Sequence, residues 1–346
     1  FLMEEGRFTF IASGSLLGVT LKKTQSVPVG YLRQIHMYPM DFEEFLWANG
    51  VGGEVMEKMR VAFERKESMP DAIHRKMMDY FRHYLLVGGF PDAVVTYLSE
   101  HNIAKVRSVQ HQIMELYIAD AAKYEENARR KLKIQQIYRM IPSYMENRKK
   151  RIVFKDIEDK KGKRVSDYQD EFEYLVSAGI ALEADAVSTP VYPLLQNATK
   201  NLFKLYLNDV GLLTAILYRN DIKPVLEDMR GINLGSVYET VVAQELRAHG
   251  FNLYYFDNKK TGEVDYLVDH VDTLSSLPIE VKSGKDYNMH RALTKFLKNP
   301  DYHVKNALVL SNEEKVYQEN GITYMPVYYM MFLSVDQTLS EAELRF

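Results

Sequence analysis

Four side chains in the C-terminal third of the chain have the types and order that suit phosphate chemistry. Glu239 lies in a helical pattern, Asp265 in an apolar run typical of a strand, and Glu280 and Lys282 in a second such run. Side chains alternate along a strand, so Glu280 and Lys282 share one face. Carboxylate oxygens suit Mg²⁺ or Mn²⁺, and such an ion can generate a hydroxide nucleophile. We therefore predict catalytic roles for all four residues, with the three carboxylates as metal ligands.

Each of these residues also has an ordinary structural interpretation. Asp265 suits a turn at a strand end, and Glu280 with Lys282 suits an exposed ion pair, which stabilises a protein little. The ordered set favours the metal site over these separate roles. Glu245 is the rival of Glu239, but it lies six positions further on and points about 240° away around a helix. The two glutamates therefore cannot both face the metal, and Glu239 is preferred because the domain family that the chain resembles has a metal-facing glutamate there.

From about residue 235 onward, the sequence alternates between patterns typical of helices and patterns typical of strands. A helix at 291–298 lies among short apolar runs that predict strands. These strands are expected at 252–256, 264–268, 279–282, 307–310 and 322–325. Such an alternation predicts a mixed sheet flanked by helices and therefore a mixed α/β class.

The first part of the chain has a different pattern. Short apolar runs predict strands at 8–12 and 30–37. Asp41, followed three residues later by Glu44, is a capping-box signature for a helix that ends near Gly50. The pattern from residue 55 to about 124 is helical, with breaks at 69–70 and 88–91, and predicts a small bundle.

The segment from residue 134 to 209 follows the order of a winged helix. Helices are expected at 134–144, after Phe154 and at 165–177, before strands at 180–185 and 203–207. Basic residues beside these helices are candidates for contacts with DNA phosphates. They are Lys149, Lys150, Lys160, Lys161, Lys163 and Arg164. A solvated loop is the alternative, because acidic residues of the third helix would repel a duplex.

Composition limits the class of protein. The 346 residues exceed one ordinary domain, so two to four packed units are expected. A formal net charge of -3 gives no global basic surface, so any contact with nucleic acid is local. The absence of cysteine excludes disulfides and thiol chemistry and fits a cytoplasmic location. No apolar run is long enough to predict a membrane span, and the initial Phe1 predicts a fragment or a processed chain.

Several ordered motifs resemble a known arrangement of domains. The runs at 8–15, 38–46 and 88–91 are similar to the end of a prokaryotic AAA+ ATPase module. The run at 205–212 and the later acidic set resemble the C-terminal domain of unknown function 4143 that accompanies it. The resemblance implies an ATP-binding core, then a winged helix and a nuclease-like domain of the PD-(D/E)xK type.

This resemblance implies four domains: the end of the AAA+ core at 1–50, a helical lid at 51–125, a winged helix at 126–215 and a nuclease-like domain at 216–346. It also places Ser13 or Ser15 where a polar residue senses the nucleotide, although a plain turn suits both equally. The phosphate-binding run Gly-x-x-x-x-Gly-Lys-Ser/Thr does not occur in the sequence. ATP binding is therefore expected only in an intact protein with the upstream Walker motifs.

The sequence thus predicts the C-terminal portion of a prokaryotic AAA+ family ATP-binding protein, with a DNA-binding winged helix and a Mg²⁺-dependent nuclease-like domain. The alternative is a non-catalytic regulatory module that binds DNA or protein and keeps a degenerate nuclease fold, since fold does not fix function. DNA is the expected partner, no membrane is expected, and a homo-oligomer or a partner protein is compatible with either interpretation.

Overall fold

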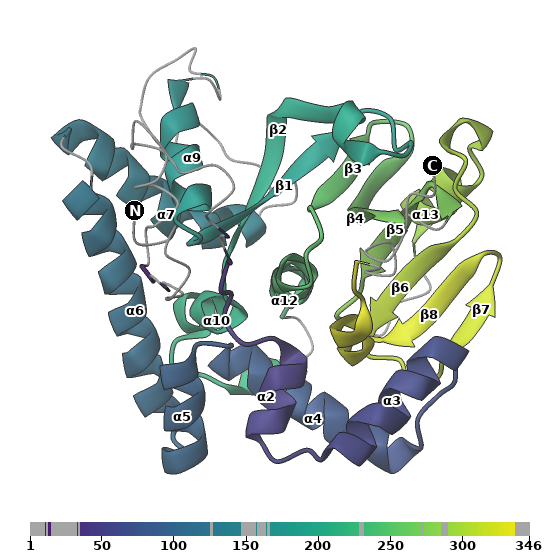
Figure 1. The fold of residues 1–346 in the computed structure, drawn as a ribbon, viewed down its shortest axis with the longest axis horizontal. Helices are drawn as coiled ribbons and strands as arrows, with labels where there is room; N and C mark the ends of the chain where they lie inside the picture. Colours follow the sequence, from purple (N-terminus) through teal and green to yellow (C-terminus); the bar gives the residue numbers. More distant parts are fainter. Residues whose placement is uncertain are drawn as a thin grey trace, which may run out of the picture.

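The computed structural model describes residues 11, 13–14, 33, 35–124, 127–146, 157, 164, 167–227, 232–270, 273–284 and 290–335. Helices surround a curved, mixed sheet of eight strands in the order β2-β1-β3-β4-β5-β6-β8-β7 (Figure 1). The predicted mixed α/β class is confirmed. None of the helices in the described ranges combines the length and apolar character needed to cross a membrane.

The first helices lie along the lower and left edges of the molecule in Figure 1. They are α2 (Phe42–Ala48), α3 (Gly53–Arg65), α4 (Asp71–Val87), α5 (Pro91–Glu100) and α6 (Ile103–Tyr124). The capping box at Asp41 and Glu44 is confirmed, as are the breaks before α4 and α5. The strand expected at 30–37 is wrong for residues 35–37, which lie in no strand and have no neighbouring strand to pair with among the described residues. The strand expected at 8–12 falls almost wholly outside them.

The next elements are α7 (Ala128–Glu146), α9 (Gln169–Ser177), β1 (Ala181–Val187), β2 (Ala198–Leu207), α10 (Val210–Tyr218) and α11 (Lys223–Leu226). Strands β1 and β2 pair antiparallel, and β1 also pairs in parallel with β3 (Tyr254–Asn258). The two strands expected for a winged helix therefore continue into the C-terminal sheet. The domain boundaries and the winged helix stay predictions.

The remaining strands are β4 (Gly262–His270), β5 (Ser275–Val281), β6 (Ala307–Ser311), β7 (Tyr317–Glu319) and β8 (Ile322–Pro326). They accompany α12 (Gly235–Ala248), α13 (Arg291–Leu297) and the short helices η2 (Leu194–Asn197), η4 (Pro300–Tyr302) and η5 (Val327–Phe332). Every strand and helix expected after residue 235 is confirmed within a few residues. The sequence did not predict α10 or the short strand β7.

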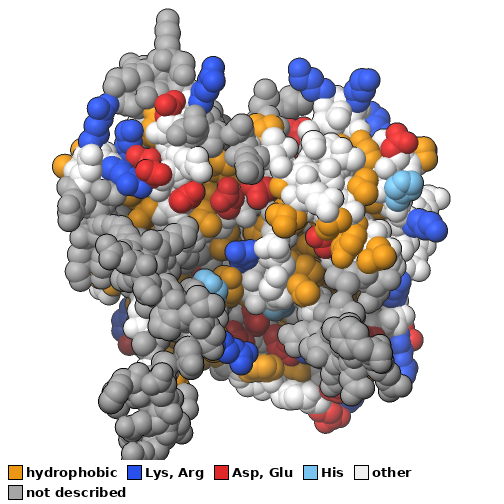
Figure 2. Space-filling view, turned by 45° about the horizontal axis from the view of Figure 1, so that its top comes forward, with side chains coloured by type: hydrophobic (Ala, Val, Ile, Leu, Met, Phe, Trp, Pro, Cys, Tyr) orange, Lys and Arg blue, Asp and Glu red, His pale blue; other side chains and the backbone are white. Residues whose placement is uncertain are grey.

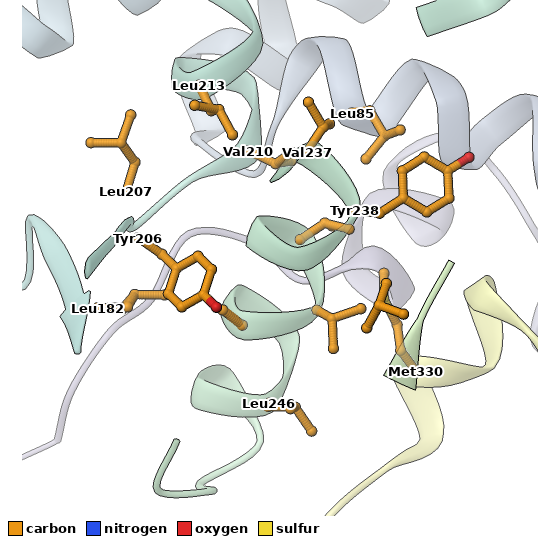
Figure 3. Packing of buried hydrophobic residues seen from close by; sticks show 14 of the residues in the cluster. Leu85, Leu182, Tyr206, Leu207, Val210, Leu213, Val237, Tyr238, Leu246 and Met330 are labelled. Atoms are coloured by element: carbon orange, nitrogen blue, oxygen red, sulfur yellow. The ribbon is translucent and has the colours of Figure 1, made fainter. Parts of the chain in front are cut away.

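Helix α12 occupies the centre of the main hydrophobic core. Its residues from Ser236 to Leu246 are all buried, as expected for a helix that is covered on every side. Figure 3 shows Val237, Tyr238 and Leu246 of α12 among side chains of β2, α10, α4 and η5. A second, smaller core on the other side of the sheet holds Phe296 of α13. The curved sheet thus wraps around α12.

A buried polar cluster joins the start of α5 to the start of α10. Asp209 caps α10 by accepting a hydrogen bond from the Leu212 amide at 3.0 Å, and its other oxygen accepts one from the Gly89 amide at 2.7 Å. The Gly89 carbonyl in turn accepts a bond from the Met40 amide at 2.7 Å. A Cβ added at Gly89 would lie 2.0 Å from the Met40 carbonyl oxygen. Glycine is therefore required where these backbones meet.

Replacing this glycine should destabilise the protein. We expect Gly89→Ala to lower the free energy of unfolding by about 2–3 kcal/mol, because the backbone at Met40 must move away from the new methyl group. Urea denaturation measures the change. Gly53→Ala is the matched control, since no atom lies within 4 Å of a Cβ added there. Equal stability of the two variants would contradict the contact.

Candidate functional site

Asp265 lies where β4 and β5 separate. The antiparallel pairing of these strands runs from His270 and Ser275 to Tyr266 and Ile279. Beyond that pair, the Asp265 carboxylate accepts a hydrogen bond from the Val281 amide at 2.9 Å. A side chain therefore satisfies the amide at the point where the backbone ladder ends.

A β-bulge sets the direction of this side chain. The pairing of β3 with β4 shifts between Tyr254, which is opposite Leu267, and Phe256, which is opposite Val264. Two residues of β4, Asp265 and Tyr266, thus stand opposite one residue of β3. Bulges bend a strand and re-aim its side chains. Here the bulge interrupts the alternation at the residue whose carboxylate reaches β5.

Glu280 and Lys282 meet as the alternation along a strand predicts. The Lys282 ammonium donates to one Glu280 carboxylate oxygen at 2.7 Å. The other oxygen is buried and has no hydrogen-bond partner among the described residues. Burial raises the pKa of Glu280 to about 8, with a further contribution from the charge of Asp265, while Lys282 opposes the shift. This carboxylate therefore has one oxygen available to a further cation.

Glu239 completes the predicted set from the helix. It is buried on α12, and its carbonyl accepts a hydrogen bond from the Tyr266 hydroxyl at 2.7 Å. Its charge contributes to the raised pKa of Glu280, after burial and the charge of Asp265. The structure therefore brings Glu239, Asp265, Glu280 and Lys282 into one region, which we call the acidic site.

The acidic site is not arranged as a three-ligand metal centre. Over the described ranges, no group of three or more His, Cys, Asp or Glu side chains is placed to hold a metal ion. Mg²⁺, however, commonly uses one or two carboxylates and completes its shell with water and phosphate oxygens. Asp265 and Glu280 supply this type of oxygen, and the second oxygen of Glu280 has no hydrogen-bond partner in the described structure. Asp265 and Glu280 are therefore the two carboxylates that could hold such an ion.

Sequence reasoning missed two residues beside this pair. Lys204 of β2 has a fully buried side chain and forms an ion pair with Glu263 of β4. Its ammonium also lies 4.6 Å from the centre of the Tyr255 ring. The one sequence signal was a lysine within the otherwise apolar run from residue 202 to 207. Periodicity in this run did not reveal that β2 would lie close to β4.

The other predicted site residues are not part of the acidic site as described. Ser13 is exposed and lies in no helix or strand. Arg164 is exposed, and its backbone amide donates to Asp167 at 2.8 Å. Six further residues lie outside the described part of the chain: Ser15, Lys149, Lys150, Lys160, Lys161 and Lys163. Acids of α9 have partners within the chain, since Asp170 pairs with Arg130 at 3.4 Å.

The charges on one face of the molecule are unevenly placed. Figure 2 shows acidic side chains gathered near the middle of this face and Lys and Arg side chains near its upper edges. Negative charge therefore gathers near the middle of this face. Such a centre favours phosphate groups only when a cation lies between the phosphate and the carboxylates.

A groove of about 1180 Å³ lies elsewhere, between α3, η5 and the strands β4, β5 and β8. Its lining includes Arg60, Phe63, Leu277 and Met325 but none of the four predicted catalytic residues. This groove is therefore separate from the acidic site.

Two family models match the chain. Residues 78–223 match a domain of unknown function, DUF8612, and residues 234–330 match a second domain of unknown function, DUF4143. The expected DUF4143 domain is therefore confirmed at 234–330, and it contains the acidic site. No curated protein and no solved structure matches the chain.

Proposed function

We propose that the acidic site of the DUF4143 domain is a metal-dependent centre for cleaving phosphodiester bonds in DNA. The observation that carries this proposal is the Asp265 carboxylate at the separation of β4 and β5, next to the Glu280–Lys282 ion pair. The proposal extends to the whole chain as the C-terminal portion of a prokaryotic AAA+ family ATP-binding protein, with a DNA-binding winged helix before the nuclease-like domain.

The charge and exposure of each residue in the acidic site indicate its role in this proposal. Asp265 and Glu280 would hold a Mg²⁺ or Mn²⁺ ion, which when bound supplies Lewis acidity and an activated water. Lys282 is the more exposed member of its ion pair, with 27% of its side chain accessible against 7% for Glu280. It can therefore turn from Glu280 to a phosphate oxygen and stabilise negative charge there. Glu239 adds negative charge from α12 and favours cation binding.

The test is cleavage of single-stranded and double-stranded DNA by the wild-type chain with Mg²⁺ or Mn²⁺. We expect product only with the metal ion, and none after addition of excess chelator. A broad panel of DNA substrates without metal-dependent product would contradict the catalytic proposal.

A non-catalytic module that binds DNA or protein is the second candidate function. Its support is the burial of Glu239, Asp265 and Glu280, each at most 8% exposed, together with the ion pair that already neutralises part of their charge. In this case the chain would bind DNA with an affinity that falls with salt, and metal ions would not cause cleavage.

A further inference from the structure

Lys204 is a positive charge supplied to the acidic site from outside the DUF4143 domain. It lies on β2, within the region 78–223 that matches DUF8612, whereas its partner Glu263 lies within 234–330. Its side chain is fully buried against the Tyr255 ring. A buried lysine carries a large desolvation cost unless it is paired. The contact therefore depends on both family regions being in place.

The charge of Lys204 lies beside the acidic site, since its partner Glu263 is on the same strand as Asp265. Burial disfavours its charged form, but Tyr206, Glu239, Glu263 and Asp265 outweigh this effect and hold the pKa of Lys204 well above its ordinary value. The geometry agrees with this effect, because the ammonium pairs with Glu263, which lies two residues before Asp265 on β4. A divalent ion placed at Asp265 would be repelled by the same ammonium.

We propose that Lys204, on a strand of the region that matches DUF8612, is a resident counter-cation that lowers the metal affinity of the acidic site. This inference rests on the proposed metal-binding function of Asp265 and Glu280.

Titration of the full chain with Mn²⁺ at low ionic strength, followed by calorimetry, tests the proposal. Lys204→Met replaces the lysine with an unbranched apolar side chain and should tighten Mn²⁺ binding by about tenfold, because a repelling charge is removed at short range. Glu263→Gln should weaken binding, because it leaves the Lys204 charge less compensated. Lys58→Met is the control, since Lys58 pairs with Glu54 on an exposed helix face, and should bind as the wild type does.

The two variants should change the Mn²⁺ affinity in opposite directions. Structural damage would instead weaken Mn²⁺ binding in both variants. If the wild type binds Mn²⁺ and Lys204→Met binds it with equal or lower affinity, the inference about Lys204 is overturned and the proposed metal site stands. Should Lys204→Met fail to fold, equal or tighter binding by Glu263→Gln overturns the inference. Failure of the wild type and of every folded variant to bind Mn²⁺ overturns the proposed metal site as well.

Discussion

The Asp265→Asn variant should lose metal-dependent DNA cleavage by at least about a hundredfold in rate while keeping its fold. Asparagine retains an oxygen that can accept the hydrogen bond from the Val281 amide, so the end of the β4–β5 ladder remains satisfied. It lacks the negative charge that a divalent ion requires. Initial cleavage rates with Mg²⁺ and Mn²⁺ measure the loss, and circular dichroism and urea denaturation check the fold.

Asp269→Asn is the matched control for this variant. Asp269 lies on the same strand and accepts a hydrogen bond from the Leu194 amide at 3.0 Å, but it is not part of the acidic site. Its substitution should leave cleavage unchanged. A different result is expected if the acidic site is only a scaffold: Asp265→Asn would then relieve repulsion with Glu280 and match or exceed wild-type stability without metal. A stabilised Asp265→Asn variant, together with no cleavage by the wild type, would favour the binding module.

Local patterns in the sequence predicted the elements of the DUF4143 domain well. Short apolar runs placed β4, β5, β6 and β8 within a few residues of their observed bounds. The capping box predicted the start of α2 correctly because its two hydrogen bonds involve residues close in the chain. Such signals contain no information about which distant strands pair. The continuation of β1 into the C-terminal sheet was therefore not predictable from periodicity.

In the candidate site, too, local sequence patterns did not predict the features that depend on the pairing of distant strands. The spacing of Glu280 and Lys282 predicted that their side chains would meet, and they do. The bulge at Asp265 and Tyr266 depends on how β4 pairs with β3, and the ion pair of Lys204 with Glu263 joins strands that are distant in sequence. Both features follow from tertiary pairing, so the sequence pattern identified the acidic residues but not their counter-charge.

A further buried carboxylate, outside the acidic site, lies between α12 and the first helices. Glu245 is fully buried, and one of its oxygens accepts hydrogen bonds from the Phe42 amide at 2.8 Å and the Tyr84 hydroxyl at 3.3 Å. The other oxygen has no hydrogen-bond partner among the described residues. Burial raises the pKa of Glu245 to about 8, the charge of Asp41 adds to the shift, and His249 opposes it. The folded chain therefore favours the protonated form of this carboxyl.

The sign of the resulting pH dependence follows from proton binding. Between the ordinary carboxyl pKa of 4.5 and about 8, the folded chain holds a proton at Glu245 that the unfolded chain has lost. The free energy of unfolding therefore falls as the pH rises through this range. A shift of this size corresponds to at most about 5 kcal/mol, and structural relaxation around the charge reduces it.

We expect Glu245→Gln to be as stable as the wild type at pH 5 and more stable by about 3 kcal/mol at pH 8.5. Glutamine resembles the protonated carboxyl in size and keeps an oxygen for Phe42 and Tyr84, but it does not ionise. Urea denaturation at the two pH values measures the difference. Glu54→Gln, at an exposed position paired with Lys58, is the control and should show no such gain. A loss of stability in Glu245→Gln that is equal at both pH values would mean that the wild-type carboxylate is ionised throughout and that its charge stabilises the fold.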